Sequence, residues 1–149
     1  MVLAQLPASV MEQLYTLLEQ MNICAKELEL ITEEEYKAIR ALDADQIIAQ
    51  TDRRALAHQA LAQLEQQCRD LLRQHHISDD ISLEVIIDMN AGERSEDLQS
   101  LRRNLYERMV RVDQRSQENH MRMHAAYNVS TNILQQLGLS QPEQTYSRR

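Results

Sequence analysis

The chain has 149 residues, a formal net charge of −7 and a hydrophobic content of 43%. It contains no Trp, no Phe and only two Gly, which argues against a compact α/β domain, since such domains need bulky aromatic side chains and tight glycine turns. The negative charge argues against nucleic acid as a ligand, because phosphate binding needs a concentrated basic footprint. The abundant Ala, Leu, Glu, Gln and Arg predict an all-α fold, with residues 1–149 forming a single helical domain.

The first helix is expected at about 8–42. Ser9 is its predicted N-cap, with Glu12 three residues later as the partner in a capping box. Thr32 and Glu35 leave two alternatives open, a second capped segment or one continuous helix. Apolar residues recur at alternating steps of four and three, a heptad seam that asks for a partner helix. The seam consists of Val10, Leu14, Leu17, Met21, Cys24, Leu28 and Ile31.

A second helix is expected at about 45–76, after a break at Asp43–Asp45. Its seam reads Ala57, Leu61, Leu64, Cys68 and Leu71. A short helix at about 79–89 follows, and Asn90–Gly92 has the composition of a turn.

The last helix, at about 94–137, is the longest, and Gly138 is its natural stop. Roughly 43 helical residues form a rod about 65 Å long. Its seam consists of Leu98, Leu101, Leu105, Met109, Val112, Ser116, Asn119, Met123, Ala126, Ser130, Ile133 and Leu137. We therefore predict an elongated, coiled-coil-like antiparallel bundle of three long helices with one short connecting helix. Residues 139–149 are expected to form a mobile tail.

The residues needed for enzymatic chemistry are missing. Two glycines cannot build a phosphate-binding loop, and no Glu has a His three residues on, as a di-iron bundle requires. Cys24 and Cys68 lie on seams without the spacing of a zinc site, so we expect small core residues. His120 and His124 share a helix face but lack a third ligand, which favours surface histidines. We therefore expect no catalytic residues, no metal and no cofactor.

The N-terminal residues lack the basic segment of a signal peptide, and no stretch of about 18 apolar residues exists to span a bilayer. We therefore expect a cytoplasmic protein that does not insert into membranes.

Twenty consecutive residues, 123–142, carry no formal charge. Depleted charge combined with Met and Tyr is typical of a protein interface, whereas the alternative is burial by the rest of the bundle. Tyr127 and Leu134 favour the interface because they lie off the seam. The predicted partner-binding residues are Asn119, Met121, Met123, Ala126, Tyr127, Val129, Ile133, Leu134 and Leu137.

Four arginines flank the seam of the last helix: Arg108, Arg111, Arg115 and Arg122. They can pair with the acidic first helix or, alternatively, with an acidic partner protein. The acidic candidates are Glu27, Glu29, Glu33 and Glu34. Asn119 has two interpretations as well: a polar break that sets helix register, or a gap where a partner helix forms hydrogen bonds.

A set of residues spread along the chain forms one further pattern. It consists of Leu14-x-x-Leu17-Leu18, the acidic stretch to Glu33-Glu34-Glu35-Tyr36, Leu61, Leu64 and Leu71-Leu72, and then Asn119, Asn132-Ile-Leu134 and Thr145-Tyr146. With this pattern the chain resembles the flagellar export chaperones of the FlgN type over nearly its whole length. It implies a chaperone that binds the C-terminal helical regions of hook-associated proteins 1 and 3 and keeps them soluble for type III export. It also implies that the last helix is the client surface and that the tail, through Tyr146, helps docking at the flagellar export gate.

The alternative function is a structural coiled-coil subunit that assembles with its own copies. A client-free chaperone can also form a homo-oligomer through its own unfilled seam.

Overall fold

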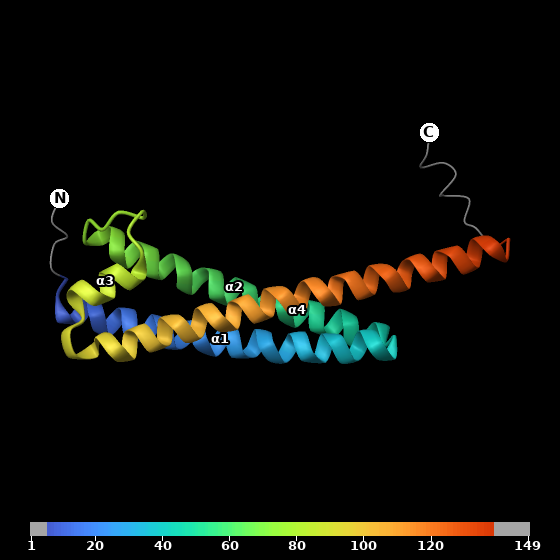
Figure 1. Ribbon diagram of the computed structural model, residues 1–149, viewed down its shortest axis with the longest axis horizontal. Helices are drawn as coiled ribbons and strands as arrows, with labels where there is room; N and C mark the ends of the chain where they lie inside the picture. The colour runs from blue at the N-terminus through green and yellow to red at the C-terminus, as the bar shows by residue number, and fades with distance from the viewer. Residues whose placement is uncertain (1–5, 139–149) are drawn as a thin grey trace, which may run out of the picture.

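The computed structural model describes residues 6–138, and these contain helices but no strand. The helices are α1 (Ala8–Ala41), α2 (Ala44–Gln74), α3 (Leu83–Asn90), the 3₁₀ turn η1 (Gly92–Arg94) and α4 (Ser95–Gln136). Successive long helices alternate in direction along one elongated bundle (Figure 1). The prediction of an all-α bundle of three long helices and one short connecting helix is confirmed.

Helix α1 is the central element. It packs against both α2 and α4, whereas direct contact between α2 and α4 is slight. This arrangement makes the buried face of α1 wider than the single predicted seam, because two helices cover it from adjacent sides. Met11, Leu18 and Ala25 are buried beside the seam, while the seam residues Leu17 and Cys24 are only half-buried.

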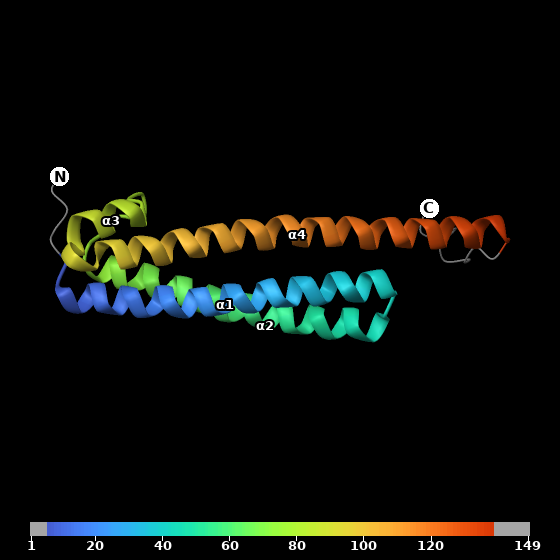
Figure 2. The same cartoon turned by 60° about the horizontal axis from the view of Figure 1, so that its bottom comes forward.

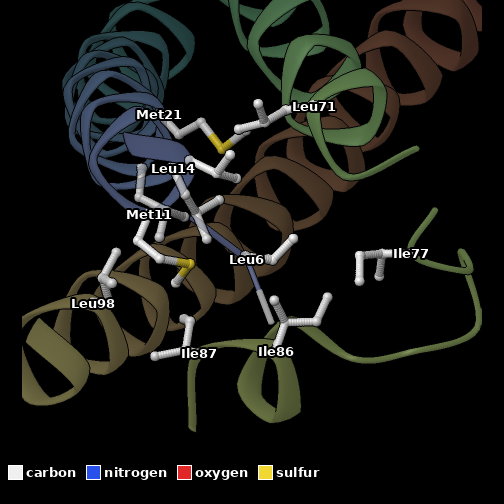
Figure 3. Packing of buried hydrophobic residues seen from close by; sticks show 11 residues of the cluster. Leu6, Met11, Leu14, Met21, Leu71, Ile77, Ile86, Ile87 and Leu98 are labelled. Carbon is white, nitrogen blue, oxygen red and sulfur yellow. The ribbon is translucent and has the colours of Figure 1, made fainter. Parts of the chain in front are cut away.

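The short helix α3 closes one end of the bundle (Figures 1 and 2). There Ile86 and Ile87 of α3 meet Leu14 of α1 and Leu98 of α4, and all four side chains are fully buried (Figure 3). This hydrophobic cluster anchors the N-terminal end of α4.

The start of α1 differs from the prediction. Pro7 occupies the N-cap position, no side chain caps the helix, and Ser9 lies inside the first turn. The carbonyl oxygen of Pro7 already accepts the amides of Val10 and Met11, so the capping box of Ser9 and Glu12 does not form. The proline itself has no N–H to satisfy, and its φ of −61° suits a helix start.

Helix α1 continues to Ala41 without a break, so Thr32 does not cap a second segment. Its hydroxyl instead donates a 2.6 Å hydrogen bond to the Leu28 carbonyl within the helix. At the far end Leu42 turns the chain with a φ of 53°, and the Asp43 carboxylate then caps α2 by accepting the Gln46 amide at 3.2 Å. This break is where the sequence predicted it.

Helix α3 begins at Leu83, later than expected, because Ser82 caps it by accepting the Val85 amide. Residues before it form turns. Gly138 follows the end of α4 with a φ of 75°, as expected of a helix stop. The predicted tail, 139–149, lies outside the described residues.

Candidate partner-binding surface

Helix α4 outruns the helices against which it packs. It has 42 residues, whereas α1 has 34 and α2 has 31, and its C-terminal end extends past the tip of the α1–α2 hairpin in both views (Figures 1 and 2). Its seam is covered from Leu98 through Val112 to Asn119, all three of which are buried. Beyond Asn119 every seam residue is exposed or half-buried.

The apolar residues beyond this point lie mainly on one face of α4. We call this face the projecting strip, and it consists of Met123, Ala126, Tyr127, Ile133, Leu134 and Leu137. Ala126 is half-buried, and the other five side chains are between 41% and 66% exposed. A contiguous aliphatic and aromatic face this open to water makes the strip a candidate interaction site.

Three predicted residues are not part of the projecting strip. Val129 is exposed at the edge of the strip, and Met121 is 70% exposed but on the opposite side of α4, since two residues along a helix turn the side chain by about 200°. Asn119 is buried, and its amide donates to the Thr32 carbonyl at 3.1 Å. We therefore leave Met121 and Asn119 out of the strip.

The arginines of α4 pair mainly with α1. Arg108 donates to Glu29 at 2.7 Å, Arg111 lies 3.7 Å from the same carboxylate, and Arg115 lies 4.0 Å from Glu33. This confirms the pairing interpretation for three of the four arginines.

Arg122 has no carboxylate partner on α1. Its partners are Glu118 and Asn119 on its own helix and the ring of Tyr36 on α1, 4.8 Å from the guanidinium carbon. Of the other acidic candidates, Glu27 pairs with Arg53 of α2 and Glu34 pairs with Lys37. Arg122 is the last charged residue of α4. The projecting strip begins at Met123 and therefore has an uncharged surface.

A second apolar surface was missed by the sequence analysis. Ile23, Leu30 and Leu56 are exposed around an open groove of about 590 Å³ between α1 and α2. The spacing of seven between Ile23 and Leu30 places them on one face beside the seam, which is the signal that could have found them.

A family model for the FlgN protein matches residues 10–149, nearly the whole chain. The chain belongs to the FlgN family. Its role is therefore that of a flagellar export chaperone, in protein export and flagellum biogenesis. No curated protein and no solved structure matches the chain at a significant level. The family match includes Tyr146, but this residue lies outside the described part of the chain, so its docking role stays a prediction.

Metal-ligating and nucleophilic side chains of this FlgN-family protein can be followed within residues 6–138. No three His, Cys, Asp or Glu side chains gather there as metal ligands, and His120 and His124 are exposed. Burial, with a smaller contribution from Glu65, raises the pKa of the Cys68 thiol to about 11. This thiol stays protonated at neutral pH and is a poor nucleophile. No helix in the described range has the length and apolar character to cross a membrane.

Proposed function

We propose that this FlgN-family chain is a cytoplasmic export chaperone that binds the C-terminal helical regions of hook-associated proteins 1 and 3 on the projecting strip of α4. One observation carries the proposal: the apolar seam of α4 continues past the hairpin tip with its side chains open to water. Family membership supports a protein client, and the exposed seam supports a helical one.

The strip is suited to a guest helix. From Met123 to Leu137 it spans about 20 Å, roughly four helical turns. A guest helix with apolar residues at a and d positions would replace the neighbour that α1 provides to the first half of α4. Burial contributes about 25 cal/mol per Å² of apolar surface, and ordering costs reduce this to an affinity that allows release for export.

The absence of charge on the strip supports a temporary client. Ion pairs across an interface fix partner choice and orientation, and the strip offers none from its own residues. Recognition then rests on apolar contacts and on the hydroxyl group of Ser130, which lies on the same face of α4, and such contacts tolerate more than one helical sequence.

The proposal is tested with a C-terminal fragment of hook-associated protein 3 and two strip variants, Met123→Asp and Leu134→Asp. Each variant places a charge against the guest helix, and we expect the affinity to fall at least about 10-fold with unchanged helicity. The measurement is titration calorimetry, with circular dichroism on the same samples.

The matched control is Val110→Asp, which changes an exposed apolar residue of the packed half of α4. We expect wild-type affinity for this variant. If the two strip variants bind as tightly as the wild type, the last helix is not the client surface.

Self-assembly is the competing use of the same strip, because a second copy also carries a complementary helix face. Light scattering across a dilution series separates the two functions. A chaperone gives a 1:1 complex with its client, whereas a structural subunit gives an oligomer that dissociates on dilution and needs no client.

A further inference from the structure

A polar cluster ties the three long helices together at Asn119, the last buried residue of the α4 seam. We call it the polar clasp; it consists of Thr32 and Glu35 of α1, Arg54 of α2 and Asn119 of α4. Thr32 and Asn119 are 1% and 2% exposed, and the side chains of Glu35 and Arg54 are 13% and 17% exposed. Such deep burial of polar groups is costly unless each is paired.

The α2 side of the clasp is a forked ion pair. The Arg54 guanidinium donates from Nε to Glu35 Oε2 at 3.2 Å and from Nη2 to Glu35 Oε1 at 3.1 Å. The same Nη2 also donates to Thr32 Oγ1 at 2.8 Å. This planar, two-pronged geometry fixes α2 against α1 in one position.

The α4 side of the clasp is Asn119. Its Nδ2 donates to the Thr32 carbonyl at 3.1 Å and to Glu35 Oε1 at 3.2 Å, and its Oδ1 accepts from Arg122 at 3.2 Å. The Asn119 amide therefore bonds to both the backbone and a side chain of α1, and its nitrogen and its oxygen both have hydrogen-bond partners.

The packed half of α4 is held mainly by apolar contacts, together with two directional ones: buried Asn22 of α1 donates to the Leu101 carbonyl at 3.0 Å, and Arg108 donates to Glu29 at 2.7 Å. Between Leu98 and Val112 the seam residues Leu101, Leu105 and Met109 are half-buried and apolar, and apolar burial has no preferred direction. Hydrogen bonds depend on distance and angle, so a small slide or roll of α4 breaks those of Asn119. A buried Asn in a coiled-coil seam commonly selects one register at some cost in stability.

We propose that the polar clasp sets the register and direction of α4 on the hairpin, and so fixes how far the projecting strip extends past the tip. Asn119 is then a positioning residue and not a contact of the client. The consequence for client affinity rests on the proposed function, whereas the consequence for geometry does not.

The test measures the geometry directly. Spin labels are placed through Asp45→Cys at the hairpin tip and Gln135→Cys on α4, both exposed, in a background with Cys24→Ser and Cys68→Ser. The parent should give one narrow distance distribution by pulsed electron resonance. We expect Asn119→Leu, and the milder Asn119→Ala, to broaden or shift the distribution. For Asn119→Leu we also expect a melting temperature equal to or above that of the parent.

The matched control is Asn132→Leu, which makes the same change at an exposed position of α4 and should leave the distribution narrow. A narrow, unshifted distribution in both Asn119 variants, with a lower melting temperature, would show that the clasp only stabilises and would overturn the proposal. Client affinity is measured in parallel. A changed distribution with unchanged affinity supports the clasp and counts against the strip as the client site, so the two failures are distinguishable.

Discussion

The two halves of α4 carry the same pattern in different surroundings. Residues 95–119 and 120–136 both repeat apolar side chains at steps of four and three. The first half is covered by α1 and α3, whereas the second half is largely exposed and its C-terminal end passes the hairpin tip. A heptad seam therefore shows that a helix requires a partner, but the lengths of neighbouring helices decide whether the same chain supplies it.

Charge separates the two halves as clearly as burial. Arg108 and Arg115 of the packed half pair with carboxylates of α1, its permanent neighbour. Nothing comparable exists from 123 to 138, where no residue carries a formal charge. A permanent contact within the chain thus has fixed ion pairs, whereas the surface we propose for a temporary partner has none.

The largest expected effect is a difference in stability between two Leu→Ala variants, one in the packed half of α4 and one in the projecting half. Leu98→Ala removes a fully buried side chain and should lower the free energy of unfolding by about 3 kcal/mol. Leu137→Ala removes a side chain that is 66% exposed and should cost less than about 0.5 kcal/mol. Urea unfolding followed by circular dichroism measures both. Equal costs would contradict the distinction between a packed and a projecting half.

A smaller effect is the difference in thiol reactivity between the half-buried Cys68 of α2 and a cysteine placed on the projecting strip. With a pKa raised by burial to about 11, Cys68 should react with a thiol reagent at pH 8 about 100-fold more slowly than an unperturbed cysteine. In a Cys24→Ser background, Ile133→Cys on the strip should react at the unperturbed rate.

The raised pKa of Cys68 also predicts how the stability of the protein depends on pH. The folded thiol of Cys68 stays protonated up to about pH 11, whereas in the unfolded chain it ionises near pH 9.0. Raising the pH above 9.0 therefore favours unfolding, and Cys68→Ala should reduce this loss of stability. For the thiol-reactivity measurement, reaction of Cys68 in the folded protein at the unperturbed rate would contradict the packing assigned to α2.

The sequence predicted the features that depend on periodicity and on local signals. These include the three long helices, the break at Asp43 and the stop at Gly138. The pairing of Arg108 and Arg115 with α1 was one of two alternatives that the sequence left open. It missed features that depend on how many neighbours a helix has. Burial of Leu18 follows from the contact of α1 with two helices, which no heptad count reveals.

The candidate site was predicted in composition more fully than in geometry. The uncharged stretch after Arg122 was visible in the sequence, but its exposure depends on where the hairpin ends. Asn119 was open to two interpretations because hydrogen bonds to Thr32 and Glu35 join residues more than 80 positions apart. Contacts of that kind become visible only when the helices are placed beside each other.

Hydrogen exchange tests the central claim most directly. In the free protein, amides of 121–136 should exchange faster than those of 98–112, because most side chains of this segment are exposed and few of them contact α1 or α2. Adding the client fragment should slow exchange across 121–136 at least about 10-fold and leave 98–112 unchanged. Client binding that protects another surface, such as the groove of Ile23, Leu30 and Leu56, while 121–136 exchanges as before, would contradict the account.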